Sequence, residues 1–172
     1  MKRHAWEGAW QGRRWLSFSV SAVLLALLAW GALRALEDAE ETSERFVVDV
    51  TLRNLRSGLQ LAMGEAMIEG RENEFASWVG SNPLRWLGTP PGGYVGTCPA
   101  QAAGLAPGAW CFDETAGELV YRPRHGARLR LASPVADPAD RRLRWRVEAT
   151  SRQPGGRVTG LRVQSVTPYA WD

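Results

Sequence analysis

The chain has 172 residues, a formal net charge of +3, two cysteines and two histidines. This length accommodates one compact domain together with a stalk or an anchor, and the small net charge is an average over zones of opposite sign. There is no histidine beside a serine or cysteine in a nucleophile motif, no metal-ligand spacing and no phosphate-binding loop, which argues against an enzyme. We therefore expect no catalytic residue, no cofactor and no metal ion.

The first predicted element is an uncharged apolar stretch, Trp15–Leu33. It matches the roughly 20 residues that a helix needs to cross a bilayer core. The tail before it, residues 1–14, is basic and the segment after it is acidic, so the positive-inside rule predicts a cytoplasmic N-terminus. A cleaved signal peptide is the alternative, but it would have a shorter apolar core and a small-x-small site, where this chain has Leu33-Arg34-Ala35. We therefore expect an uncleaved, single-pass anchor.

A second helical pattern follows the anchor, and residues 34–70 are predicted to form a stalk and an amphipathic helix that ends at Gly70. No proline occurs between Arg34 and Ile68, and apolar residues recur at steps of three and four, which marks one face of an α-helix. The half nearer the anchor is mostly polar and is expected to be a solvated stalk. The apolar face comprises Val48, Leu52, Leu55, Leu59, Ala62 or Met63, and Ala66.

Residues 71–109 are predicted to form a short helix and a long loop. The helix is expected around residues 72–79, where Phe75 and Trp78 can face the core. The connection that follows is rich in glycine and proline, and connections this long are usually functional or pinned. Cys98 offers such a pin.

Residues 110–172 are predicted to form an antiparallel sheet. Between Leu143 and Glu148, apolar and charged side chains alternate strictly, which is typical of a strand with one buried face. The apolar half of the long helix is the natural cover for that face. The predicted fold class is therefore α+β: a transmembrane helix continues into a long amphipathic helix packed on a four- to five-stranded antiparallel sheet. The predicted strands are Trp110–Asp113, Glu118–Arg122, Arg128–Ala132, Leu143–Thr150 and Val158–Val166.

The two cysteines, Cys98 and Cys111, are predicted to form a disulfide. In an oxidising compartment, thiols that can reach each other tend to pair, and a closed loop of about 14 residues contributes about 3 kcal/mol in the chain-entropy model. Free thiols and a metal site are the alternatives. A four-ligand metal site would need both His4 and His125, and His4 is expected on the other side of the membrane.

Four short motifs occur between residues 82 and 121, from the predicted loop through the second predicted strand. Together with the predicted architecture they resemble the type IV pilin and pseudopilin group, and in particular the small bitopic F component of MSHA-type pilus biogenesis. The resemblance covers roughly residues 15–122. The motifs are Asn82-Pro83, Pro90-Pro91-Gly92-Gly93-Tyr94-Val95-Gly96, Gly108-Ala109-Trp110-Cys111-Phe112-Asp113 and Leu119-Val120-Tyr121.

The resemblance implies an accessory protein of a bacterial inner membrane, with a periplasmic domain that contacts pilins or platform proteins of the assembly machinery. Pilins carry a glycine before their cleavage site and a glutamate at the fifth mature position. Here Gly12 is followed by Arg13 and Arg14, and the apolar stretch has no acidic residue. This departure favours a resident membrane protein over a fibre subunit. The alternatives are a minor pilin or pseudopilin in the fibre, and a bitopic envelope scaffold or anionic-polymer binding module unrelated to pili.

Two sets of residues are candidate binding surfaces. The aromatic set could contact another pilin-like domain, or its members could belong to core packing and a simple connector. The arginine set is expected on the open sheet face, where it could bind anionic lipid, lipopolysaccharide or an acidic partner, or be solvated. Because Trp145 alternates with these arginines and does not share their face, nucleic acid is not an expected partner. A small-molecule substrate is not expected either, since no catalytic motif is present. The aromatic set is Trp110, Phe112, Tyr121, Asn82, Pro83 and Tyr94, and the arginine set is Arg128, Arg130, Arg142, Arg144 and Arg146.

Overall fold

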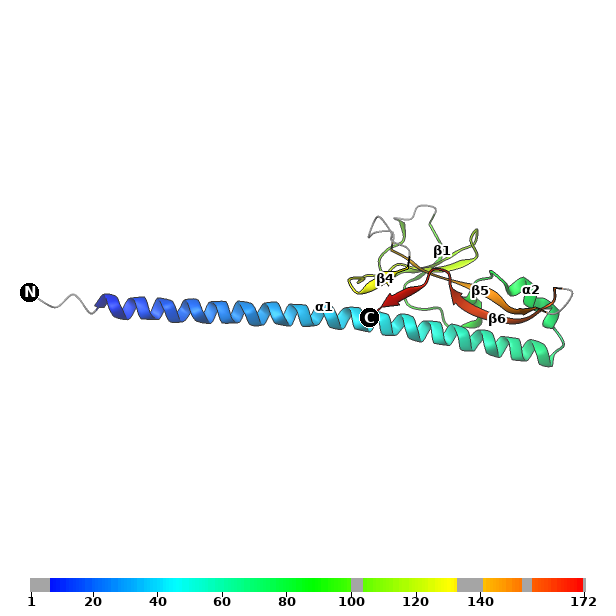
Figure 1. The fold of residues 1–172 in the computed structure, drawn as a ribbon, viewed down its shortest axis with the longest axis horizontal. Helices are drawn as coiled ribbons and strands as arrows, with labels where there is room; N and C mark the ends of the chain where they lie inside the picture. The colour runs from blue at the N-terminus through cyan, green and yellow to red at the C-terminus, as the bar shows by residue number, and fades with distance from the viewer. Residues whose placement is uncertain (1–6, 100–103, 133–140, 153–155, 172) are drawn as a thin grey trace, which may run out of the picture. The chain divides into compact units, whose positions relative to one another are not determined.

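The chain forms two compact units, Met1–Thr42 and Ser43–Asp172. The first contains the N-terminal part of one long helix, and the second contains the rest of that helix and all strands (Figure 1). Lys2 and Arg3, on which the predicted orientation depends in part, lie outside the described residues. The computed structural model describes residues 7–99, 104–132, 141–152 and 156–171.

Helix α1, Glu7–Ile68, is unbroken and contains both the predicted anchor and the predicted amphipathic segment. From Phe18 onward it is long and apolar enough to span a membrane. From Phe18 onward, large apolar side chains of its first section are exposed: Phe18, Leu25 and Leu28 are each at least 66% exposed. The chain therefore has one described helix that fits a single-pass membrane protein.

Helix α1 ends where the sequence predicts, beside Gly70. The N–H of Arg71 donates to the carbonyl of Ala66 at 2.7 Å, and the N–H of Gly70 donates to the carbonyl of Met67 at 3.2 Å. This pair of bonds is a Schellman motif, which needs a left-handed residue just past the helix. Gly70 has a φ of 69°, which glycine adopts without a Cβ clash.

The distal half of α1 buries the apolar face that its periodicity predicts. Complete burial of a leucine or valine side chain contributes about 1.5–3 kcal/mol, so this face is a main source of the domain's stability. Ala62 and Met63 are partly buried against the same core. The fully covered positions, each at most 3% exposed, are Val48, Leu52, Leu55, Leu59 and Ala66.

Three short helical segments connect α1 to the sheet. The predicted helix around residues 72–79 is divided into a 3₁₀ turn and a single α-helical turn, while Phe75 and Trp78 are buried as expected. The third segment lies within the predicted loop. The segments are η1 (Glu72–Glu74), α2 (Phe75–Trp78) and η2 (Pro83–Trp86).

The main sheet has five strands in the order β1-β2-β3-β5-β6. Strands β2, β3, β5 and β6 pair antiparallel, as predicted, but β1 pairs parallel to β2, so the sheet is mixed and the fully antiparallel prediction is wrong. Parallel neighbours need a crossover of about a dozen residues, which the connection 98–109 supplies. The strands are β1 (Tyr94–Thr97), β2 (Trp110–Asp113), β3 (Glu118–Tyr121), β5 (Leu143–Arg152) and β6 (Val158–Ser165).

A second, two-stranded sheet corrects another part of the prediction. Strand β4, Leu129–Leu131, was expected in the main sheet but pairs antiparallel with β7, Tyr169–Trp171. Because β3 pairs directly with β5, no place for β4 remains between them. Leu129 and Trp171 lie opposite each other and are both buried, so this small sheet extends the same core.

Aromatic side chains form the centre of the core. The rings of Trp110 and Tyr121 are 4.4 Å apart, and those of Trp110 and Trp145 are 5.5 Å apart, distances at which aromatic pairs attract each other. Leu143, Trp145 and Val147 are at most 1% exposed, which confirms the predicted alternation of β5.

Candidate functional site

The predicted disulfide lies at one end of the outer face of the main sheet. Cys98 and Cys111 are bonded, with their Cα atoms 4.9 Å apart. The N–H of Cys98 donates to the carbonyl of Phe112 at 2.9 Å, so the end of β1 is held to β2 by both a covalent bond and a hydrogen bond. The disulfide prediction is confirmed, and it indicates an oxidising compartment.

The described residues 104–109, which precede β2, cover one part of this outer face. Leu105 and Ala109 pack with Cys111 and Val120 in a small apolar cluster separate from the main core. All four are at most 5% exposed. The disulfide therefore lies inside a local core, and the β2–β3 part of the face is closed to partners by the chain itself.

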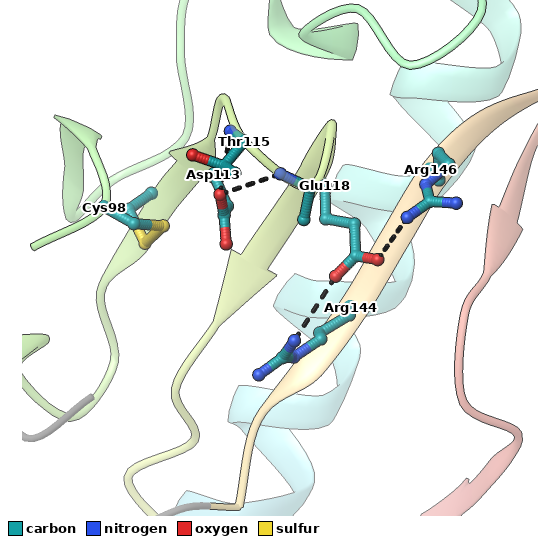
Figure 2. A network of polar contacts seen from close by, with 8 residues as sticks. Cys98, Asp113, Thr115, Glu118, Arg144 and Arg146 are labelled. Atoms are coloured by element: carbon teal, nitrogen blue, oxygen red, sulfur yellow. Dashed lines mark hydrogen bonds and ion pairs between the residues drawn. A yellow bond between two sulfur atoms is a disulfide. The ribbon is translucent and has the colours of Figure 1, made fainter. Parts of the chain in front are cut away.

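The next part of the outer face holds a buried carboxylate between two arginines. Glu118, on β3, is 4% exposed, and its Oε1 accepts a hydrogen bond from Nη2 of Arg146 at 2.6 Å. Its Oε2 accepts a longer one from Nη1 of Arg144 at 3.4 Å. Figure 2 shows Glu118 pointing toward these two side chains of the neighbouring strand β5. Two members of the arginine set thus share one negative partner.

The arginine set does not form a single face. Arg144 and Arg146 lie on β5, and Arg142 directly precedes that strand. Arg130 lies on β4 of the second sheet, and Arg128 comes just before it. The alternation within each segment was predicted, but the division between two sheets follows from strand pairing that the sequence pattern does not encode.

The aromatic set divides between core and loop. Trp110, Phe112 and Tyr121 are at most 8% exposed, which corresponds to the core-packing alternative and leaves little of them for a partner. The loop members have local structural roles. Asn82 caps η2 by accepting the N–H of Leu84 at 3.0 Å.

Asn82 also joins its loop to the sheet. Its Nδ2 donates to the hydroxyl of Tyr94 on β1 at 3.0 Å. Pro83 is buried and occupies the first position of η2, where a missing N–H leaves no bond unmade. The Asn-Pro motif therefore fixes the start of a helical turn and its distance from β1.

A cluster of hydrogen bonds around one carboxylate of α1, that of Glu44, fastens the helix to β3 and to the β3–β4 connection. The sequence did not reveal this cluster. Glu44 Oε1 accepts hydrogen bonds from the hydroxyl of Tyr121 and the N–H of Arg124, both at 2.6 Å. Its Oε2 accepts the N–H of His125 at 2.9 Å and lies 3.1 Å from His125 Nδ1. The Glu44 side chain is only 9% exposed. Hydrogen bonds to a charged acceptor are the strong kind, so this cluster is a clamp.

Burial and Glu44 raise the pKa of Tyr121 far above its ordinary value of 10.0. Burial is the largest cause, because it disfavours the ionised phenolate. Glu44 adds a hydrogen bond that only the protonated phenol can donate, and then a repulsion that only the ionised form experiences. Tyr121 therefore remains a donor to Glu44. From sequence, Glu44 looked like one of several solvated acids of the stalk, since its partners lie about 80 residues away.

The described residues contain no group of three or more histidine, cysteine, aspartate or glutamate side chains placed to hold a metal ion. The polar clusters that they do contain, around Glu44 and Glu118, join elements of the domain to one another.

No protein-family model, curated protein or solved structure matches this chain.

Proposed function

We propose that this chain is an inner-membrane accessory protein of type IV, MSHA-like pilus biogenesis that acts through protein–protein contacts. The first section of α1 anchors it, its N-terminus is cytoplasmic, and its α+β domain is periplasmic. Pilins or platform proteins of the assembly machinery are its partners. The proposal combines the motif resemblance with the helix-on-sheet architecture of the external unit.

The change in burial along α1 is the observation that carries the proposal. Val23, Leu28 and Leu33 are at least 58% exposed and need an apolar environment that the described protein does not supply. Beyond Ser43 the same helix buries one face completely under a sheet. Trp30 lies near the distal end of the apolar stretch with Arg34 over its ring at 5.3 Å, a pair suited to the headgroup layer.

The disulfide supports an external position for the domain. Structural disulfides persist in the periplasm and in secretory compartments and are rare in the cytosol. The basic tail before the anchor supports the same orientation through the positive-inside rule.

Co-purification tests the partner class. The tagged full-length protein is recovered from mildly solubilised membranes of the organism that encodes it, after cross-linking, and its partners are identified by mass spectrometry. We expect pilins, the assembly ATPase or the platform protein. A matched control carries the same tag on an unrelated single-pass protein. Recovery of cell-wall or outer-membrane components without pilus proteins would contradict the proposal.

The sheared fibre fraction distinguishes a resident accessory protein from a minor pilin. We expect the chain in the membrane fraction and not in purified fibres, because its apolar stretch has no glutamate and its N-terminus departs from the pilin cleavage pattern. Stoichiometric recovery of the chain in fibres would instead assign it to the minor pilins.

A further inference from the structure

Strand β6 is an edge of the main sheet, and a groove runs beside it. No strand among the described residues pairs with its second side. Between β6 and α1 lies a groove of about 250 Å³, and Figure 1 shows the two elements side by side. The groove is lined by Arg56, Leu59 and Gln60 of α1 and by Leu161, Arg162, Val163 and Gln164 of β6.

Hydrogen bonds of β5 indicate which residues of β6 direct their backbone N–H and C=O groups to the open edge. The N–H of Val166 donates to the carbonyl of Arg144, whereas Gly80 donates to the carbonyl of Val147 from the other side. Even-numbered residues of β5 therefore point their backbone groups at β6, and the alternation of an antiparallel ladder assigns the even-numbered residues of β6 to that pairing. The N–H and C=O groups of Leu161 and Val163 are directed to the open edge.

The open part of the edge is regular. The register irregularities between β5 and β6 are confined to the part of β6 before Leu161. Natural proteins protect exposed edges with bulges, prolines or very short strands. Strand β6 has eight residues and no proline, so residues 161–165 remain suitable for pairing with another strand.

The groove carries positive charge that the described residues barely neutralise. Arg162 is 57% exposed on its side chain and has one carboxylate neighbour, Glu148, at 4.0 Å. Arg56 is exposed and has no hydrogen-bond or ion-pair partner among the described residues. Arg56 lines the groove from α1, whereas Arg162 alternates with the buried Leu161 and Val163 and therefore projects to the outer face of the sheet. A strand added along β6 would have one arginine beside each of its faces.

Charge and size select the occupant. A second copy pairing through β6 would bring Arg162 and Arg56 of both copies into one groove, and like charges across a strand pair are destabilising. The groove volume of about 250 Å³ is below the roughly 300–1,000 Å³ of pockets that hold drug-sized ligands, so it has room only for side chains of a strand that lies along the edge. An extended segment needs only a backbone edge and room for alternate side chains, and acidic side chains complement the two arginines.

We propose that the β6–α1 groove binds an extended acidic segment of another protein, which adds as a sixth strand along Leu161–Ser165 and directs carboxylate side chains toward Arg56 on one face and Arg162 on the other. Its backbone bonds to Leu161 and Val163 provide the pairing, and the arginines provide the preference for acidic sequences. This site goes beyond the proposed function and does not depend on it.

The test uses the full-length protein in nanodiscs and a fluorescein-labelled peptide of about eight residues, within the usual length of a strand, which is composed of valine and glutamate and has glutamates on both faces of the extended chain. A second peptide has glutamine in place of every glutamate. Fluorescence anisotropy gives the affinities, and hydrogen-exchange NMR reports on the amides. We expect the acidic peptide to bind at least about tenfold more tightly, less so at high salt, and to slow exchange at Leu161 and Val163.

Charge reversals locate the site. Arg56→Glu and Arg162→Glu should each weaken the acidic peptide about threefold to tenfold. The control Arg53→Glu makes the same change one turn earlier on α1, outside the groove, and should leave affinity unchanged. Because Arg56 is exposed on a helix, Arg56→Glu keeps the test valid even if Arg162→Glu perturbs the sheet edge.

Three outcomes would overturn the proposal: equal affinity for the acidic and the glutamine peptide, affinity unchanged by both groove reversals, or exchange protection away from Leu161 and Val163. Self-association that depends on Arg162, measured by sedimentation, would assign the groove to a second copy instead. Peptide binding in a protein that recovers no pilus component would refute only the proposed function.

Discussion

At the scale of single residues, the most informative contact is between Tyr121 and Glu44. The tyrosine hydroxyl is one of several donors to a nearly buried carboxylate that belongs to α1. Its partners come from β3 and the connection that follows, so one acid holds helix and sheet at a fixed distance. Such a bond acts on stability through both its strength and the protonation state of the tyrosine.

Removing the hydroxyl by Tyr121→Phe should lower the free energy of unfolding by about 1.5–3 kcal/mol at neutral pH, as for a hydrogen bond to a charged group. Tyr94→Phe is a matched control, because it removes only a neutral bond to Asn82 and should lose about 0.5–1.5 kcal/mol. Urea unfolding of the full-length protein, followed by tryptophan fluorescence, measures both. Equal losses would contradict a charged clamp.

The raised pKa of Tyr121 predicts a loss of stability in alkaline solution. The unfolded chain releases this proton near pH 10, whereas the folded chain retains it, so unfolding becomes more favourable as pH rises above about 10. The free energy of unfolding should fall by at most about 1.4 kcal/mol per pH unit for each such group. The stability difference between wild type and Tyr121→Phe should therefore shrink from about pH 8 to about pH 11, and a constant difference would contradict it.

At Gly58, the close approach of another backbone segment determines whether a substitution by alanine stabilises or destabilises the domain. A Cβ at this position would lie 2.6 Å from the carbonyl oxygen of Trp86, whereas one at Gly64 would meet nothing within 4 Å. Alanine favours a helix over glycine by up to about 1 kcal/mol. We expect Gly64→Ala to stabilise the domain by up to that amount, and Gly58→Ala to destabilise it by about 1–3 kcal/mol through the clash. Thermal unfolding of the two variants provides the comparison, and stabilisation by both would exclude the close approach.

At the scale of elements, the disulfide holds the crossover that makes β1 a parallel neighbour of β2. Closing this loop of about 14 residues should contribute about 3 kcal/mol. Cys98→Ser should therefore lower the melting temperature of the oxidised protein and leave that of the reduced protein nearly unchanged. Wild type treated with reductant is the control, and an unchanged oxidised melting curve would show that the bond does not stabilise the domain.

Element identity was easier to predict than element pairing. The buried face of α1, the hairpin of β2 and β3 and the alternation of β5 were all visible in local periodicity, and the structure confirms them. Strand β1 was missed because its four residues lie in a glycine- and proline-rich stretch. Strand β4 was recognised but placed in the wrong sheet, because its partner β7 is a three-residue strand that no pattern distinguishes from a loop.

At the scale of the whole molecule, the orientation across the membrane is the property to test. A fusion of alkaline phosphatase, which is active only in the periplasm, should be active after Asp172 and inactive before Met1. Reversing the charges of Lys2, Arg3, Arg13 and Arg14 together should weaken or invert this difference, because the positive-inside rule assigns the orientation to them. An active N-terminal fusion on the unmodified chain would contradict the cytoplasmic tail.

The candidate sites show which contacts local sequence patterns can predict and which they cannot. Cys98 and Cys111 were paired correctly because a two-cysteine chain has one possible intramolecular pairing. The arginines of β5 were correctly predicted to alternate, but their neutralisation by Glu118 depends on β3 lying beside β5. Glu44 was not identified, since nothing in the acidic stalk distinguishes it from its neighbours until Tyr121 and His125 are brought to it.

By itself, the sequence determined the apolar helix, its amphipathic continuation, the disulfide partners and the faces of the longer strands. These properties depend on the order of side chains along a few turns or one strand, where period and composition are enough. Only the tertiary structure decided the parallel β1, the separate β4–β7 sheet, the Glu44 clamp and the groove beside β6. Each of these joins segments that are distant in sequence, and such contacts are selected by how the whole core packs.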